Sequence, residues 1–86
     1  MRHAYVYVLV STAKSPRLSY VGWTLDLDRR LAEHNALDGR RRGAKSTRGR
    51  QWLLVYAEKC PGKRDAMRRE FRLKRDRAFR KALRAL

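Results

Sequence analysis

The first predicted helix carries two polar side chains at positions where an amphipathic helix normally has apolar ones. Leu27 and Leu31 are four residues apart and lie on one stripe of that helix. Arg30 and His34 fall three and seven residues after Leu27, so both share the stripe and point inward. Polar side chains are rarely buried without a partner, so we expect these two to border a partly open pocket.

A later predicted helix, over residues 65–75, repeats this pattern. Glu70 and Lys74 fall inside its apolar arc instead of opposite it. The arc consists of a stripe, Met67 and Phe71, with Ala66 and Leu73 beside it. Two interpretations stay open: a structural salt bridge such as Arg30 with Glu70, or a pocket where the helices meet the sheet.

Two predicted strands bring tyrosines to the same region. Residues 5–10 are β-branched or aromatic throughout, which predicts a strand covered on both faces. Residues 20–23 form a second strand, and the two strands pair as a hairpin with a long loop. Tyr7 and Tyr20 therefore lie on neighbouring strands and could offer hydroxyls to one pocket, although lone tyrosines in strands usually belong to the core.

The remaining elements complete an α+β arrangement in the order β-β-α-β-α-α. They are a helix from the N-cap Asp26 to about Leu37, a third strand over residues 52–57, and helices over residues 65–75 and 78–86. A three-stranded antiparallel sheet with helices packed against it is the natural packing solution for this order. The length of 86 residues predicts a single domain over residues 1–86.

The charge of the chain is strongly positive and regional. The formal net charge is +15, and 18 of the 23 basic residues lie from Arg40 onward. A field of this size attracts polyanions, and counterion release makes nucleic acid the default partner, with RNA as open as DNA on charge alone. An acidic membrane surface or an acidic protein are the lesser alternatives.

A basic segment without apolar periodicity follows the first helix. Phosphate contact is favoured there over a merely solvated linker, and the expected contact residues are Arg40, Arg41, Arg42, Lys45, Thr47, Arg48 and Arg50. The arginines at 68, 69, 72, 75 and 77 predict a second phosphate-tracking surface, against the alternative of a solvated helix face. Trp23 and Trp52 could stack on unpaired bases but are more often core or rim residues.

Several classes of protein are disfavoured. No apolar run approaches the length of a membrane span, and we expect a cytoplasmic chain that makes no membrane contact. Cys60 is the single cysteine, so no internal disulfide forms, and with His3 and His34 it gives no zinc-binding spacing. No nucleotide cofactor is expected.

Taken in order, these residues resemble the GIY-YIG endonuclease superfamily. The motif residues are Tyr5-Val6-Tyr7, then Tyr20-Val21-Gly22, followed by Arg30, His34 and Glu70. The similarity is closest to the small stand-alone bacterial members, which look like the catalytic subunit of structure-specific endonucleases. The segments 31–35 and 43–50 are also typical of that branch. Tyr5, Val6 and Val21 replace the usual Gly and Ile residues of the motifs, which should alter packing more than chemistry.

The resemblance implies a divalent-metal-dependent endonuclease. Glu70 would hold one Mg²⁺ or Mn²⁺, whose other ligands are water and phosphate oxygens. Arg30 would stabilise the transition state, while His34 could orient the phosphate or relay protons. Gly22 would leave room for the DNA backbone, and Lys74 would support Glu70 or bind phosphate.

The general base implied by the resemblance is a tyrosine. Tyr7 would deprotonate the attacking water, and Tyr20 could share or exchange that role. An ordinary tyrosine pKa of about 10 forbids this unless cations such as Lys45, Arg30 or the metal lower it.

The implied function is hydrolysis of phosphodiester bonds in DNA, in branched, flapped or single-stranded substrates and in a repair or recombination context. Two alternatives stay open on the same residues. One is a non-catalytic nucleic-acid-binding module, which the composition supports equally well. The other is a catalytic subunit that is inactive until a protein partner completes its surface.

Overall fold

A three-stranded antiparallel sheet forms the centre of the molecule. The computed structural model describes residues 3–12, 17–35 and 51–86. Strands β1 (Ala4–Ser11), β2 (Ser19–Thr24) and β3 (Trp52–Cys60) are arranged in the order β2-β1-β3. Helices α1 (Leu27–His34), α2 (Lys63–Arg75) and α3 (Arg77–Arg84) complete the order β-β-α-β-α-α, which confirms the predicted fold class.

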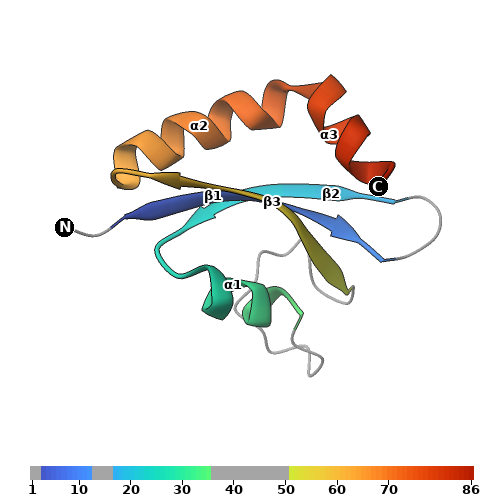
Figure 1. Cartoon of the computed structure of the whole chain (residues 1–86), viewed down its shortest axis with the longest axis horizontal. Coiled ribbons are helices and arrows are strands. Elements are labelled where there is room, and N and C mark those ends of the chain that lie inside the picture. Colours follow the sequence, from blue (N-terminus) through green and yellow to red (C-terminus); the bar gives the residue numbers. More distant parts are fainter. Residues whose placement is uncertain (1–2, 13–16, 36–50) are drawn as a thin grey trace.

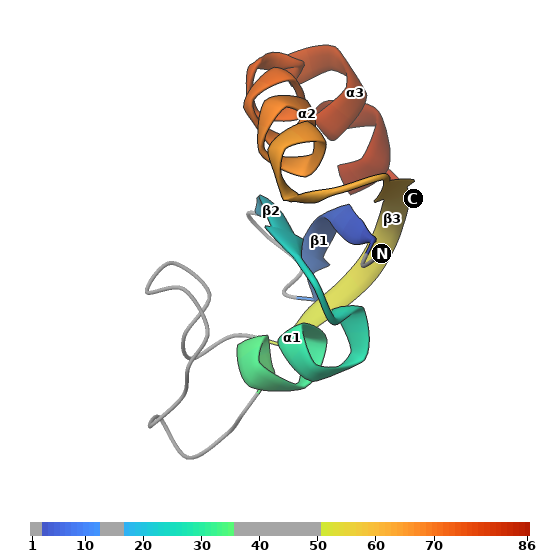
Figure 2. The same cartoon turned by 90° about the vertical axis from the view of Figure 1, so that its left-hand side faces the viewer.

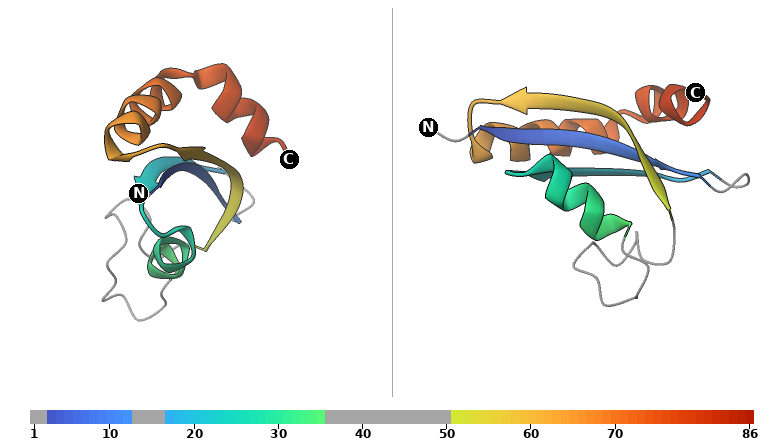
Figure 3. Two further views of the ribbon diagram at one scale, coloured as in Figure 1. Left: turned by 60° about the vertical axis from the view of Figure 1, so that its left-hand side comes forward. Right: turned by 60° about the horizontal axis from the view of Figure 1, so that its bottom comes forward.

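The helices cover the two faces of the sheet unequally. Helices α2 and α3 lie on one face and α1 on the other, as Figures 1 and 2 show. Figure 3 shows α1 below the sheet, close to the start of β3. The sheet is therefore a central layer, and side chains that alternate along β1 enter two separate cores.

The central strand supplies both cores. Every residue from Val6 to Ser11 is buried, as expected for a strand covered on both faces. Val6 and Val8 pack toward α2 with Ala66 and Leu73, whereas Tyr7 and Leu9 pack on the α1 side. The period-2 alternation of β1 thus places Tyr7 on the face that α1 covers.

Most element boundaries differ from those predicted by one or two residues, and two ends differ by three. Helix α1 ends at His34, with Asn35 as its C-cap, before the expected Leu37, which lies outside the described residues. Strand β3 continues past residue 57 to Cys60 because Ala4, Tyr5 and Val6 of β1 offer pairing partners to its last residues.

The predicted apolar stripe of α2 is wrong. Ala66 and Leu73 are the buried residues of this helix, whereas Met67 is 46% exposed and Phe71 is 60% exposed. The small Ala66 lets the helix approach the sheet closely, and Leu73, about two turns later, fills the same face. The larger apolar residues consequently point to solvent.

Candidate active site

A buried hydrogen bond joins β1 to α1. The Tyr7 hydroxyl lies 2.9 Å from Nε2 of His34, and both side chains are almost completely buried. Their rings meet edge to face with centroids 5.9 Å apart. The inward positions predicted for the helix are thus confirmed for His34, which occupies the core with a specific partner.

The protonation states of the pair follow from burial. Burial, together with the nearby Arg30 charge, lowers the pKa of His34 to about 4. Burial also raises the pKa of Tyr7 to about 12, against the opposing hydrogen bond and charge of Arg30. At neutral pH, Tyr7 is therefore a neutral phenol that shares a hydrogen bond with the neutral His34 ring. Arg30 acts to lower the pKa of Tyr7, as expected of a nearby cation, but desolvation outweighs it, and the effects of Lys45 and of a metal stay predictions.

Tyr20 and Gly22 complete the wall around this pair. The Tyr20 ring lies 4.9 Å from the His34 ring and 6.2 Å from the Tyr7 ring, centroid to centroid. Gly22 pairs directly with Tyr7 across β1 and β2, and a Cβ atom there would lie 2.6 Å from the Tyr7 hydroxyl oxygen. Glycine at this position therefore accommodates the two tyrosine rings, and its expected contact with nucleic acid stays a prediction.

Arg30 lies at the open side of the Tyr7–His34 pair. Its side chain is 26% exposed and forms an ion pair with Glu33 at 2.9 Å. Arg29 binds the same carboxylate at 3.2 Å from the solvent side. The Arg30 guanidinium also lies close enough to Tyr7 to oppose the rise in its pKa. One face of this arginine thus contacts the buried pair while the other can reach an anion.

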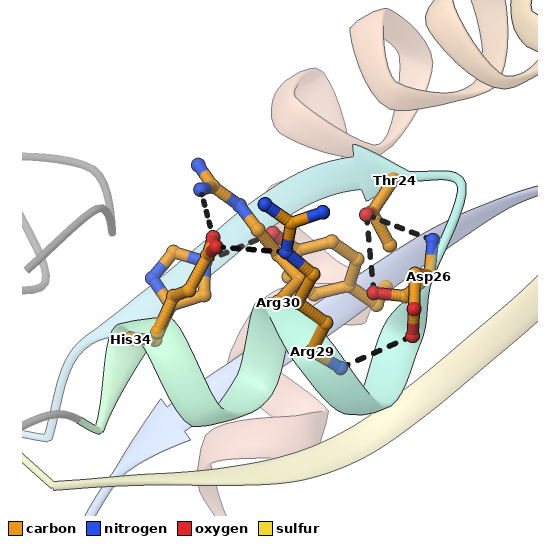
Figure 4. Close-up of polar contacts among 7 residues, drawn as sticks. Thr24, Asp26, Arg29, Arg30 and His34 are labelled. Carbon is orange, nitrogen blue, oxygen red and sulfur yellow. Dashed lines mark hydrogen bonds and ion pairs between the residues drawn. The ribbon is translucent and has the colours of Figure 1, made fainter.

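The first turn of α1 is fixed by capping interactions. Asp26 accepts a hydrogen bond from the backbone N–H of Arg29 at 3.1 Å, which confirms it as the N-cap. The hydroxyl of Thr24 accepts from the N–H of Asp26 at 3.1 Å. Figure 4 shows how these contacts and the ion pairs hold Arg30 and His34 on one side of the helix. The residues after β2 therefore determine where α1 begins, and with it the position of Arg30.

A groove runs along this side of the molecule. It has a volume of about 640 Å³, and Trp23, Arg30 and Glu33 are among its lining residues. Trp23 is half-buried at this groove, whereas Trp52 is 4% exposed and packs beside Tyr7 and Leu9. The favoured core position is thus confirmed for Trp52, whereas base stacking by Trp23 stays a prediction.

Glu70 approaches the site from α2, on the other face of the sheet. Its side chain is 22% exposed and lies 3.7 Å from Nζ of Lys74. Its charge is the weakest of the several causes that act on the pKa of Tyr7, after burial, Arg30 and Tyr20. Arg30 therefore forms an ion pair with Glu33 on α1, and Glu70 forms one with Lys74 on α2.

The carboxylate of Glu70 fits a weak, open cation site. Among residues 3–12, 17–35 and 51–86, no group of three His, Cys, Asp or Glu side chains could hold a metal ion. A single partly exposed carboxylate offers a hard oxygen ligand of the kind that Mg²⁺ and Mn²⁺ accept, with water and substrate phosphate as further ligands. The donor set fits an ion bound together with its substrate.

Sequence reasoning did not assign a role to Asn35. Its side-chain oxygen accepts from the backbone N–H of Trp52 at 2.6 Å, and its amide donates to the Trp52 carbonyl at 3.0 Å. These two bonds attach the end of α1 to the start of β3 and hold His34, the preceding residue, in place. The signal for this role in the sequence was an asparagine that directly follows an inward-facing histidine at the end of a helix.

The basic segment expected to contact phosphate falls outside the residues that the structure describes. This applies to Arg40, Arg41, Arg42, Lys45, Thr47, Arg48 and Arg50, whose roles stay predictions. Of the predicted surface arginines, Arg69 is engaged by Glu58, whose carboxylate oxygens lie 2.8 and 3.1 Å from Nε. Tyr56 also donates to Glu58, so this arginine belongs to a network on the α2 side of the sheet.

Comparison with known proteins assigns the chain to a family. Residues 3–82 match the model of the GIY-YIG catalytic domain, and the chain belongs to this family of nucleases. A UPF0213 protein from Halobacterium salinarum is 45% identical over 96% of this chain and 99% of its own length. A UPF0213 protein from Staphylococcus haemolyticus is 41% identical over 79% of this chain and 78% of its own length. No solved structure matches the chain significantly.

The family match confirms the resemblance that the motif residues indicated. It covers β1 through most of α3, and thus every described residue of the candidate site. No helix of the described segments is long and apolar enough to cross a membrane.

Proposed function

We propose that this chain is a divalent-metal-dependent endonuclease that hydrolyses phosphodiester bonds in DNA. The observation that carries the proposal is the buried Tyr7–His34 hydrogen bond with Arg30 at its open side and the charge of Glu70 nearby. A purely structural role does not require a charged arginine beside a buried tyrosine–histidine pair. Hydrolysis of a phosphodiester needs a group that binds the phosphate and a path for a proton, and Arg30 with the Tyr7–His34 pair could supply both.

Arg30 is the phosphate-binding group of the proposed mechanism. Its guanidinium is charged at every relevant pH and can contact two oxygens of one phosphate. Substrate phosphate would compete with Glu33, whose carboxylate the guanidinium contacts in the free chain. The same cation stabilises the negative charge that develops on the phosphate oxygens in the transition state.

Tyr7 and His34 form the proton path. A tyrosine with a pKa of about 12 is a poor base by ionisation, so Tyr7 acts as a relay. The attacking water passes a proton to the phenol oxygen as the phenol passes its own proton to Nε2 of His34. The water oxygen bonds to phosphorus while the bond to the leaving oxygen breaks, and the leaving oxygen takes a proton from a solvent water. Negative phosphate beside His34 raises its pKa from about 4 and so favours proton acceptance.

Glu70 is the proposed ligand for one Mg²⁺ or Mn²⁺. When bound, such a cation supplies Lewis-acid polarisation of a phosphate oxygen. Glu70 positions its carboxylate from α2, and Lys74 orients it from one turn away. Tyr20 packs against both members of the relay and keeps water away from His34.

The proposed substrates are branched, flapped or single-stranded DNA, in a repair or recombination context. The net charge of +15 supports binding to any nucleic-acid backbone, so RNA belongs in the same assay. Membership of a nuclease family supports a nucleic-acid substrate, and DNA is proposed from the resemblance of the motif residues to endonucleases.

The test is cleavage of end-labelled DNA of defined shape. Single-stranded, duplex, flap and four-way-junction DNA, with a matched RNA, are incubated with Mg²⁺ or Mn²⁺ and, as a control, with a chelator. We expect products from the wild type and from Asp65→Asn, which removes an exposed carboxylate of the same helix. Glu70→Gln should bind DNA and cleave none. Cleavage by Glu70→Gln, or in the chelator, would overturn the metal assignment. Binding without cleavage by the wild type on every substrate would leave a binding module.

A further inference from the structure

The solvent face of α2 combines exposed apolar residues with a dense set of cations. Met67 and Phe71, one turn apart, are 46% and 60% exposed. They line a groove of about 810 Å³, and its other lining residues are all basic: Lys63, Arg64, Arg68 and Arg72. Large apolar side chains exposed on a small domain mark an interaction surface when they gather in one patch. We call these six residues the α2 patch.

The patch is distinct from the surfaces that packing already explains. Helix α2 packs against the sheet through Ala66 and Leu73, on the opposite side of the helix. Arg69 is held by Glu58 and takes no part in the patch. Neither Met67 nor Phe71 fills the core of the described structure, so their exposure lacks a structural explanation.

Two cation–π contacts show how the patch is organised. The guanidinium carbon of Arg75 lies 4.8 Å from the centroid of the Phe71 ring. Nζ of Lys63 lies 5.9 Å from the Trp23 ring, which links the start of α2 to β2. The patch therefore extends from the β2 edge along the helix, and Phe71 is oriented by a cation on one side.

We propose that the α2 patch binds one strand of the nucleic-acid substrate, with a base stacked on Phe71 and phosphates held by the surrounding cations. The proposal rests on the proposed function for the identity of the ligand and adds a second contact surface to it. An exposed aromatic ring among cations is the combination with which proteins hold unpaired strands.

Continuity with the candidate site favours nucleic acid over an acidic protein segment. Glu70 and Lys74 lie on the same helix, between its buried side and the patch, and Trp23 lines the groove beside Arg30. Helix α2 is about 18 Å long from Lys63 to Arg75, which is long enough to contact several nucleotides of one strand. A single strand could thus contact both the patch and the groove. A second copy of this chain is disfavoured because it would bring cations against cations.

The test separates stacking from simple charge attraction. Anisotropy is measured with a fluorescent oligodeoxynucleotide of about ten nucleotides and with an abasic strand of the same length, in a chelator so that no cleavage occurs. We expect Phe71→Ser to weaken binding of the normal strand about tenfold and to leave binding of the abasic strand unchanged. Phe71→Trp should restore binding and show fluorescence quenching, whereas Phe71→Leu should not restore it.

The matched control is Leu53→Ser, which removes an apolar residue that is 51% exposed on β3. It should leave binding of both strands unchanged. If Phe71→Ser lowered the affinity for the normal and abasic strands equally, the stacking assignment would be overturned. Full recovery of affinity in Phe71→Leu would overturn it as well. An amphipathic glutamate-rich peptide that loses affinity in Phe71→Ser, while the oligonucleotide does not, would overturn it in favour of an acidic protein partner.

Failure of this inference is distinguishable from failure of the proposed function. The binding measurement uses no catalytic step, and Glu70→Gln should retain the preference for the normal strand over the abasic strand. A protein that cleaves DNA but lacks the Phe71 effect would refute only the patch. A protein that shows the Phe71 effect but cleaves nothing would refute only the endonuclease.

Discussion

Gly22 lies directly opposite Tyr7 in the β1–β2 ladder, and the absence of its side chain makes room for the Tyr7 hydroxyl. A Cβ atom at Gly22 would lie 2.6 Å from that oxygen and 2.9 Å from Cε2 of Tyr20. That oxygen also forms a hydrogen bond with Nε2 of His34, so the Tyr7 ring has little freedom to move away. The second tripeptide motif therefore supports the first one sterically.

Gly22→Ala is expected to destabilise the fold and to separate Tyr7 from His34. Overpacking of this kind costs about 1–3 kcal/mol of unfolding free energy. Urea unfolding measures the loss, and the NMR signals of the His34 ring report the broken hydrogen bond. Gly62→Ala is the matched control, because a Cβ atom there meets nothing within 4 Å. Equal, small effects of the two substitutions would contradict the steric role of Gly22.

Asn35 is expected to position His34 through its two bonds to Trp52. Asn35→Ala leaves the N–H and carbonyl of Trp52 without these partners, at a cost of about 1–3 kcal/mol. As the end of α1 loosens and water reaches His34, its pKa should rise from about 4 toward the ordinary value of 6.5. NMR titration follows this directly, since His3 is the sole other histidine and serves as a reference.

The matched control for Asn35 is Gln51→Ala. Its side chain donates to the Asn35 carbonyl at a long 3.4 Å, so its loss should leave the titration of His34 unchanged. A His34 pKa that stays near 4 in Asn35→Ala would show that the asparagine attaches α1 to β3 without positioning the histidine.

His34 should make stability depend on pH in the acidic range. The pKa of His34 is lowered to about 4 in the folded chain, so between pH 4 and 6.5 the unfolded chain binds the additional proton. Stability from this residue is fully present above pH 6.5 and is lost as the pH falls toward 4, by about 3 kcal/mol at most. Urea unfolding of wild type and His34→Gln across this range measures the difference. The matched control, His3→Gln, removes an exposed histidine and should retain the wild-type slope. If the unfolding free energy of His34→Gln depended on pH as steeply as that of the wild type, the buried neutral state of His34 would be contradicted.

Periodicity predicted the sheet and the inward position of His34 because both depend on local alternation. Tyr7 alternates with buried valines along β1, and His34 follows Leu27 by two helical turns. The stripe of α2 could not be predicted in the same way. Two adjacent faces of that helix carry apolar residues, and the choice between Ala66 with Leu73 and Met67 with Phe71 depends on how closely the helix approaches the sheet.

The protonation state of the site could not be predicted from the sequence either. A base role for Tyr7 was expected to require that cations such as Lys45, Arg30 or the metal lower its pKa, and Arg30 does act in that direction. The opposite outcome arises from desolvation, which depends on Leu9, Trp52 and the other side chains of the α1-facing core. Neighbouring charges can be inferred from motif spacing, whereas the degree of burial is a property of the whole fold.

The most direct test of the central claim is the rate of DNA cleavage by Tyr7→Phe beside the wild type. This change removes one oxygen and leaves the ring, so the fold and DNA binding should be retained. We predict that the cleavage rate at saturating DNA falls by about 10² or more, with an unchanged dissociation constant for DNA. Cleavage by Tyr7→Phe at the wild-type rate would contradict the proton relay through Tyr7 and His34.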